Sequence, residues 1–376
     1  MDLALTESQE MLRSAARSFV EREAPRHTIV ALQRAESSLV PELWGKASEL
    51  GWLGILVPAR YGGSESSLTD AAVLYEELGR GPLPGPFFSS GVLGALTVME
   101  AATEEQRSEL LPRVARGETV LVVAVTEPNG SWGPQGVTLV PQRIGGRYRL
   151  DGTKLFVSDA TSATELAVAV RTGDGPGDLS LLVVDAKAPG VRIRRLPGFV
   201  SWQCEVTFDG VEVETTRLLG GREHRGWAAL ERALLRAWPV LCSYMVGGCQ
   251  AVFEMSVAHS QVRVQFGVPI GKFQRVQDHI IRLVNHLDAA RWTTAEALWK
   301  LDTGLPDAAA AAVHMAKAVS SEAYLEACNA AHEVHAGQGS LIEYGLAAHT
   351  QMSRTLFAYL GDPRWHKRRM TDALSW

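Results

Sequence analysis

The spacing of hydrophobic residues changes twice along this chain of 376 residues. From Leu5 to about Arg116, apolar residues recur every three or four positions, as they do on one face of an α-helix. From about Glu118 to Leu219 they form short β-branched runs between glycine-rich turns, which is the pattern of strands. From about Gly226 the helical spacing returns. The pattern therefore predicts a helical, a β and a second helical zone, in that order.

Local signals place individual helices in the two outer zones. Thr6 followed by Gln9 has the form of a capping box, so we predict that a helix starts there. Further helices are predicted near residues 42–50 and 70–78. Pro306 separates two helices of the last zone.

The central zone contains β-branched runs at 120–123, 181–184 and 191–193, with no helical stretch between them. Parallel strands are usually connected through a helix, so this pattern favours an antiparallel barrel or sandwich. The three zones give expected domain boundaries at 1–117, 118–224 and 225–376, and an α+β fold class.

Composition narrows the class of protein. Hydrophobic residues make up 46% of the chain and charged residues 21%, as in a soluble globular protein. The net charge of −5 lacks the basic footprint of a nucleic-acid-binding protein. Apolar runs stay short of the roughly 18 residues that span a membrane, and residues 1–7 do not resemble a signal peptide. The four scattered cysteines form no metal or disulfide pattern, so we expect a cytoplasmic protein without a metal site.

Several short motifs occur in the order of the three zones. Each is weak alone, but together they resemble the acyl-CoA dehydrogenase family over essentially the whole chain. The resemblance rests on the opening segments at 5–9, 51–63 and 75–80, on Ala-Val-Thr-Glu-Pro at 124–128, on Gly-Thr-Lys-Leu-Phe-Val-Ser at 152–158, and on Arg263, Phe266, Gly267, Ile270 and Gln274. It implies an N-terminal helical domain, a central β domain and a C-terminal four-helix bundle.

The resemblance also implies FAD as cofactor, held by residues from two subunits. The isoalloxazine ring would lie against backbone and hydroxyl groups of the central domain. Arg263 would bind the pyrophosphate, and a neighbouring chain would supply the groups of the C-terminal zone. The expected cofactor-binding residues are Val125, Thr126, Phe156, Val157, Ser158, Arg263, Phe266, Gln274, Glu333 and Gly337. A homodimer, a homotetramer or a mixed assembly with a related subunit is implied.

Two positions that hold the catalytic glutamate in this family lack a carboxylate here. One precedes a glycine near the C-terminus, and this chain has Leu360 there. The other corresponds to Ala237, with Trp238 where an arginine is often found. Neither Leu360 nor Ala237 can accept the α-proton of an acyl thioester.

Two other side chains are weak candidates for the base. Tyr244 lies two turns beyond Ala237 on the same helix face, but the ordinary pKa of a tyrosine is about 10. Asp362 precedes Pro363, a pairing more typical of a helix N-cap than of a base. Glu333 replaces a common glutamine beside the expected flavin loop, where an anion is unfavourable unless it points away. The nearby His332 and His335 lack further ligands for a metal ion and are interpreted as structural.

Three functions fit these observations. The first is α,β-desaturation of an acyl thioester of CoA or a carrier protein, either with an unusual base or with this chain as the base-lacking subunit of a mixed assembly. The second is a flavin oxidase or monooxygenase on the same fold, which needs no α-proton abstraction. The third is a non-catalytic protein that keeps the fold. The retained flavin motifs count against the third, and the missing glutamate counts against a self-sufficient dehydrogenase.

Overall fold

The computed structural model describes residues 4–32, 35, 39–197, 203–304 and 306–374. They form two compact units, each built from segments that are far apart in the sequence. The helical unit takes in the described parts of 1–34, 67–83 and 238–376, and the β-containing unit those of 35–66 and 84–237.

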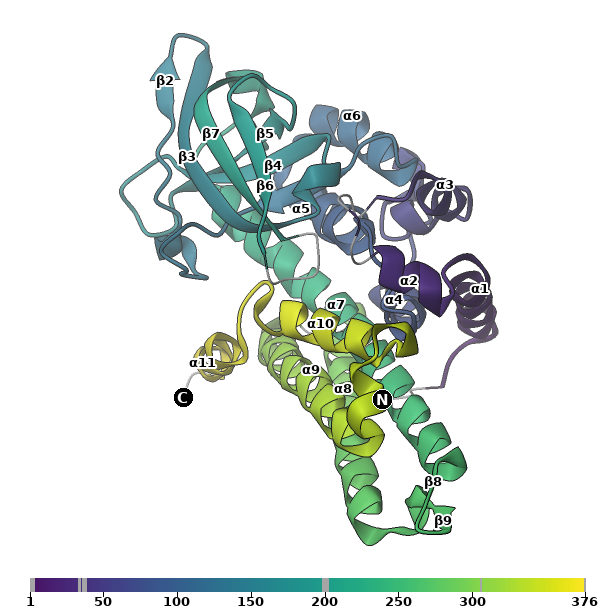
Figure 1. Cartoon of the computed structure of the whole chain (residues 1–376). Helices are drawn as coiled ribbons and strands as arrows, with labels where there is room; N and C mark the ends of the chain where they lie inside the picture. The colour runs from purple at the N-terminus through teal and green to yellow at the C-terminus, as the bar shows by residue number, and fades with distance from the viewer. Residues whose placement is uncertain (1–3, 33–34, 36–38, 198–202, 305, 375–376) are drawn as a thin grey trace. The chain divides into compact units, whose positions relative to one another are not determined.

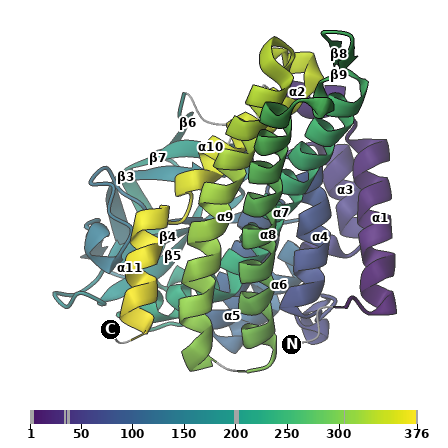
Figure 2. The same ribbon diagram turned by 90° about the horizontal axis from the view of Figure 1, so that it is seen from below.

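The helical unit contains a bundle of long helices. Its members are α1 (Glu7–Glu23), α2 (Arg26–Leu32), α4 (Leu68–Arg80), the part of α7 (Gly226–Val262) from Trp238 onward, α8 (Gln274–Asp302), α9 (Pro306–His335), α10 (Leu346–Ala358) and α11 (Pro363–Ala373). Figure 2 shows α7, α8 and α9 running side by side, with α11 beside α9. The expected C-terminal helical bundle is confirmed, and α11 adds a further helix to it.

Local sequence determines where several of these helices start. The hydroxyls of Thr6 and Ser67 accept hydrogen bonds from the backbone of Gln9 and Asp70, whose side chains bond back to the caps. The capping box predicted at Thr6 is therefore confirmed. Asp362 likewise caps α11 through the backbone N–H of Trp365, at 2.9 Å.

Glycines let α4 and α7 approach closely inside the helical unit. A Cβ added to Gly79 would lie 1.9 Å from the carbonyl oxygen of Tyr244, and one added to Gly247 would lie 1.8 Å from that of Glu76. Both distances are far below any real contact, so a larger residue at either position would push the helices apart.

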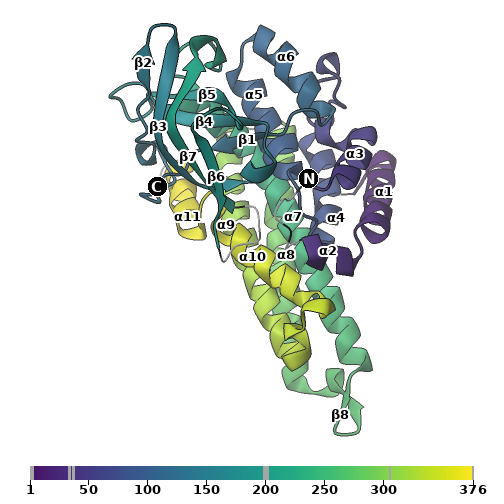
Figure 3. The same cartoon turned by 45° about the horizontal axis from the view of Figure 1, so that its top comes forward.

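The β-containing unit combines two main sheets with short helices. The helices are α3 (Pro41–Glu49), the π-helical η3 (Phe87–Gly94), α5 (Ala95–Ala101) and α6 (Glu104–Ala115). The strands are β1 (Leu121–Ala124), β2 (Gln142–Ile144), β3 (Arg147–Ser158), β4 (Glu165–Arg171), β5 (Leu179–Asp185), β6 (Val191–Arg195) and β7 (Gln203–Glu214). Figures 1 and 3 show the broad sheet that β3 and β7 form with β2 and β6.

Strand order corrects one detail of the expected antiparallel arrangement. One sheet has the order β2-β3-β7-β6 and is antiparallel throughout, whereas the other has the order β1-β4-β5. Within the second sheet β1 and β4 are parallel. The chain leaves β1, forms β2 and β3 in the other sheet, and then returns, so a strand-containing crossover replaces the usual helix. The α+β class and the helix–sheet–helix order are confirmed.

Among the described residues, one helix, α7, is long and apolar enough to cross a membrane by length and composition alone. However, 67% of its most apolar window is buried inside the protein. That burial is typical of the central helix of a folded core.

Candidate functional site

A β-bulge in β3 brings together the two central segments that the sequence assigns to the flavin. The pairing of β3 with β7 shifts register between Lys154 and Val157. Inside this shift, the backbone N–H of Leu155 donates to the carbonyl oxygen of Thr126, at 2.8 Å. The bulge thus turns β3 toward the segment after β1, as bulges beside functional sites often do.

The residues around the hydrogen bond between Leu155 and Thr126 carry hydroxyl groups that can still form hydrogen bonds with a ligand. Phe156 has a positive φ of 55°, a conformation that non-glycine residues seldom adopt. The hydroxyl of Thr126 has no hydrogen-bond partner among the described residues, although Thr126 is only 8% exposed. Ser158 Oγ accepts a bond from Gln203 Nε2, at 2.7 Å, which leaves its own proton to donate. Two open hydroxyls beside strand backbone suit the hydrogen-bonding edge of a flavin, so these residues fit that cofactor.

A buried ion pair between Lys154 and Glu127 connects β3 to the segment that follows β1. Lys154 is fully buried, and its Nζ lies 2.7 Å from Glu127 Oε1 and 3.1 Å from the carbonyl oxygen of Val125. Glu127 also accepts from the backbone N–H groups of Thr138 and Leu139. Burial by itself raises the pKa of Glu127, but these partners outweigh it and hold that pKa below its ordinary value. The motif residues Glu127 and Lys154 therefore form a structural clamp between the two segments. The sequence analysis did not predict this role.

Five predicted cofactor residues lie at one end of the helical unit. The hairpin of β8 (Val264–Gln265) and β9 (Val268–Pro269) follows α7, and Phe266 at its turn is 93% exposed. Arg263 and Gln274 flank the hairpin and are also exposed, and the side chain of Arg263 makes no ion pair within the described residues. Glu333 and Gly337, at the end of α9 and the turn after it, are exposed as well.

The histidines at this end pack against one another. The rings of His259 and His335 stack with centroids 4.4 Å apart, which places the end of α7 beside the end of α9. His335 Nε2 lies 3.3 Å from Ser256 Oγ, and His332 Nε2 lies 2.8 Å from Thr350 Oγ1. Within the residues that the structure describes, no group of three acidic, histidine or cysteine side chains could hold a metal ion. These contacts are those of structural histidines.

The turn that carries Leu360 is held by three side chains. Trp238 Nε1 donates to the carbonyl oxygen of Leu360 at 3.0 Å, and His366 Nε2 lies 3.2 Å from the same oxygen. Lys317 Nζ donates to the carbonyl oxygen of Gly361 at 3.2 Å. Leu360 has a φ of 57° and Gly361 a φ of 109°. The turn is therefore fixed in a left-handed conformation that leucine seldom adopts.

Lys317 is unusual because it is fully buried without a carboxylate beside it. Its other partner is Ser321 Oγ, at 2.8 Å, and it makes no ion pair with the described acidic residues. Burial lowers its pKa to about 8, and the nearby Cys242 and Asp362 offset this only in part. His366 lies against the same turn, and His314 packs against His366, with their Nδ1 atoms 2.9 Å apart. Burial lowers the pKa of His314 to about 4 and that of His366 further still. Lys317 and His366 hold the backbone at 360 and 361, and neither presents a carboxylate.

The other catalytic candidates have structural partners. Asp362 caps α11, and Tyr244 is buried with its hydroxyl 3.2 Å from the carbonyl oxygen of Leu83, to which it donates. Ala237 is fully buried in α7. Asp362 and Tyr244 thus match the N-cap and the packing residue that the sequence favoured for them, and no base is evident at either usual position.

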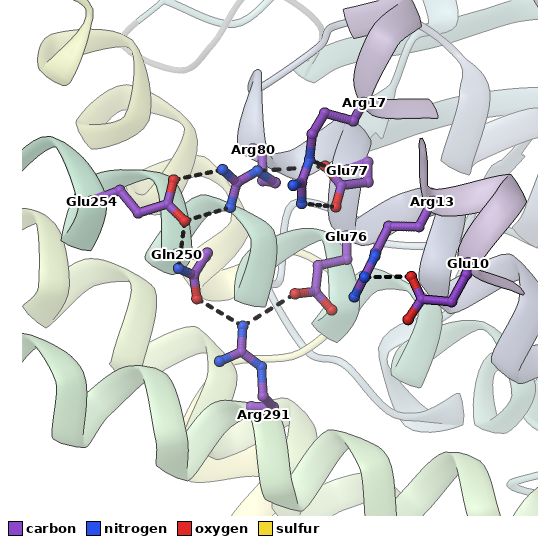
Figure 4. A network of polar contacts seen from close by, with 9 residues as sticks. All are labelled: Glu10, Arg13, Arg17, Glu76, Glu77, Arg80, Gln250, Glu254 and Arg291. Carbon is purple, nitrogen blue, oxygen red and sulfur yellow. Dashed lines mark hydrogen bonds and ion pairs between the residues drawn. The ribbon is translucent and has the colours of Figure 1, made fainter. Parts of the chain in front are cut away.

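An ion-pair network explains the motif at 75–80 (Figure 4). Glu77 of α4 accepts two bonds from Arg17 of α1, at 3.0 and 2.7 Å. Arg80 binds Glu254 of α7, and Glu76 meets Arg291 of α8 at 3.1 Å. The three partners of the motif lie on three different helices, α1, α7 and α8, so the motif joins α4 to three other helices of the bundle.

Comparison with known proteins agrees with the resemblance seen in the sequence. The models "Acyl-CoA dehydrogenase, N-terminal domain", "middle domain" and "C-terminal domain" match residues 6–118, 122–211 and 224–374. The probable acyl-CoA dehydrogenase YngJ of Bacillus subtilis is 30% identical over 355 residues, or 92% of each chain.

Solved structures share the fold along the whole chain. The FAD complex of PigA has a TM-score of 0.91 at 24% identity, covering 100% of this chain and 99% of that one. The ChsE4-ChsE5 complex from Mycobacterium tuberculosis has a TM-score of 0.89 at 22% identity, with the same coverage. With three ordered domain matches and a relative 30% identical over nearly its full length, the chain belongs to the acyl-CoA dehydrogenase family of oxidoreductases.

Proposed function

We propose that this protein binds FAD and takes part in the α,β-desaturation of an acyl thioester, of CoA or of a carrier protein, as a subunit that does not supply the base itself. It would work in a mixed assembly with a related subunit, and the proposal implies a soluble, cytoplasmic protein. The observation that carries the proposal is the turn at Leu360. Its backbone is held by Trp238, His366 and Lys317, yet its side chain cannot take a proton.

Support for FAD comes from the central domain. The open hydroxyls of Thr126 and Ser158 and the bulge that brings them together suit a flavin. The structural neighbour PigA was solved as a complex with FAD. At the far end of the bundle, Arg263 has no acidic partner among the described residues and would bind the pyrophosphate of FAD on a neighbouring chain.

These positions suggest separate roles for FAD and for the residues of this chain. FAD, when bound, supplies the acceptor for the β-hydride of the thioester. Thr126, Phe156 and Ser158 would orient the ring, and the clamp of Lys154 and Glu127 would keep the strand that carries them in place. The α-proton needs a base beside the thioester, and Leu360 and Ala237 provide none.

A mixed assembly would account for a retained cofactor region without a base. The structural neighbour ChsE4-ChsE5 is a complex. In such an assembly the partner would supply the carboxylate, and this chain would contribute cofactor contacts. A flavin oxidase or monooxygenase remains the second reading, because such chemistry needs no α-proton abstraction.

The deciding experiment restores the base. We expect the purified homomer to be a poor dehydrogenase of ordinary acyl-CoA thioesters, because general-base assistance is worth about 10²–10⁴-fold in rate. Leu360→Glu should raise anaerobic flavin reduction by an acyl-CoA toward that range. The control is Leu360→Gln, which has a similar shape but cannot accept the proton. Ala237→Glu tests the second position in the same way.

Two results would count against the proposal. Brisk turnover by the unmodified homomer, lost in Asp362→Asn or Tyr244→Phe, would show that the base has moved within this chain. Oxygen consumption with no anaerobic bleaching by any acyl thioester would favour the oxidase or monooxygenase instead.

A further inference from the structure

Gln203 holds an unusual position behind Ser158. It is the first residue of β7, it is 4% exposed, and it is the direct cross-strand partner of Ser158, the last residue of β3. Its carbonyl oxygen accepts a hydrogen bond from the backbone N–H of Leu196 at 2.8 Å, so the backbone of Gln203 is fixed. Cross-strand partners share a face of the sheet, which is why the amide reaches the serine hydroxyl.

The nitrogen and the oxygen of the Gln203 side-chain amide differ in their hydrogen bonding. Nε2 donates to Ser158 Oγ at 2.7 Å, a short and well-placed bond. Oε1 is buried and has no hydrogen-bond partner among the described residues. A buried acceptor without a partner lowers stability, whereas an apolar side chain of the same size would avoid that loss. The folded state alone therefore gives little reason for a glutamine here.

The bond to Ser158 decides what that hydroxyl can do. A serine hydroxyl has one proton to donate and lone pairs that accept. Because Gln203 donates to Oγ, the hydroxyl proton is turned away from β7 and stays available to another acceptor. Without the amide, the hydroxyl could rotate and would spend part of its time in other directions.

We propose that Gln203 is a positioning residue that fixes the Ser158 hydroxyl as a hydrogen-bond donor toward the bound flavin. The inference rests on the proposed function, in which Ser158 faces FAD. It assigns to Gln203 a role that acts through Ser158 alone, so the two residues should behave as one unit.

Four variants of the full-length protein test this role. They are Gln203→Met, Ser158→Ala, the double variant, and Gln142→Met as control. Gln142 is also the first residue of a strand in the same sheet, but its side chain is exposed. For each variant, the FAD dissociation constant, the flavin absorption spectrum and the melting temperature of the flavin-free protein are measured.

We expect Gln203→Met to shift the flavin absorption bands and to weaken FAD binding about fivefold, the effect of one hydrogen bond. Its flavin-free melting temperature should be unchanged or higher, because the orphaned acceptor is gone. Ser158→Ala should give a similar shift, the double variant no more than Ser158→Ala, and Gln142→Met none.

Other outcomes would overturn the inference. A Gln203→Met protein with the wild-type spectrum and affinity would show that the amide does not act on the flavin. Additive effects of the two single substitutions would show that Gln203 acts independently of Ser158. A lower melting temperature with an unchanged spectrum would mark Gln203 as structural. Failure of the wild-type protein to bind FAD at all is a separate result, and it would reject the proposed function together with this inference.

Discussion

Two fully buried lysines, one in each unit, show how differently the cofactor region and the base position are built. Lys154 lies behind the flavin strand and pairs with Glu127 at 2.7 Å. Among the described residues, Lys317 at the Leu360 turn has hydrogen bonds to one hydroxyl and one carbonyl oxygen. Burial lowers the pKa of both to about 8. The expected cofactor region thus contains a complete charge pair, whereas Lys317 at the Leu360 turn makes no ion pair with a described carboxylate.

If the proposed function is right, flavin binding and proton abstraction depend on separate parts of this fold. A flavin site needs strand geometry and polar groups that are held in place, and the β-containing unit offers both. A base needs one ionisable side chain at one position, which a single substitution removes while the turn around it survives.

The largest effect is expected from breaking the complete pair. Lys154→Met leaves the Glu127 carboxylate buried without its cation, and should lower the free energy of unfolding by about 3–5 kcal/mol. Thermal or urea unfolding measures this, with the exposed Lys187→Met as control. The double variant Lys154→Met/Glu127→Gln should recover much of the loss. A Lys154→Met protein as stable as wild type would show that the clamp contributes nothing.

The next effect concerns the exposed end of the bundle. If Arg263 binds the FAD pyrophosphate, Arg263→Ala should weaken flavin retention by about 1.5–3 kcal/mol, the worth of a charge-assisted contact. Flavin content and the FAD dissociation constant report it. Arg275→Ala removes an exposed charge nearby and should leave both unchanged. Equal losses in the two variants would indicate a general charge effect.

Acid should weaken the helical unit first, because it holds every histidine except His224. Burial lowers the pKa of His349 to about 3 and that of His314 to about 4. As the pH falls from 6.5 toward 4, these histidines become protonated in the unfolded chain but stay neutral in the folded protein. The free energy of unfolding should therefore fall with pH, by up to about 1.4 kcal/mol per pH unit for each histidine.

The variant His349→Asn tests that slope, because the amide of asparagine can keep a hydrogen bond to the Tyr324 hydroxyl, which lies 2.9 Å from His349 Nδ1 in the native protein. Urea unfolding at pH 7 and pH 5 should show a shallower loss in this variant. His27→Asn, at an exposed position, serves as the control and should follow wild type.

The smallest effect separates a helix cap from a base at Asp362. Asparagine caps helices as well as aspartate does, so Asp362→Asn should change neither stability nor activity appreciably. Asp362→Ala should cost about 1 kcal/mol of stability without a specific loss of activity. Loss of turnover in both variants at unchanged melting temperature would instead identify Asp362 as a base.

The amino-acid sequence by itself determined the order of helical and β zones, the capping box at Thr6 and the N-cap at Asp362. These features depend on residues close together in the chain, and local periodicity or a neighbouring amide is enough to specify them. The ordered motifs also led to the family. The absence of a carboxylate at position 360 follows from one residue, Leu360, and its consequence for catalysis stays a prediction.

The tertiary structure decided what those motifs do. The clamp between Glu127 and Lys154, the bond from Gln203 to Ser158 and the grip of Lys317 on Gly361 join residues 27, 45 and 44 positions apart. The parallel pairing of β1 with β4 likewise depends on a crossover through the other sheet. Strand register, a bulge and helix packing set these contacts, and none of them leaves a periodic signal in the sequence, because each pairs side chains across elements rather than along one.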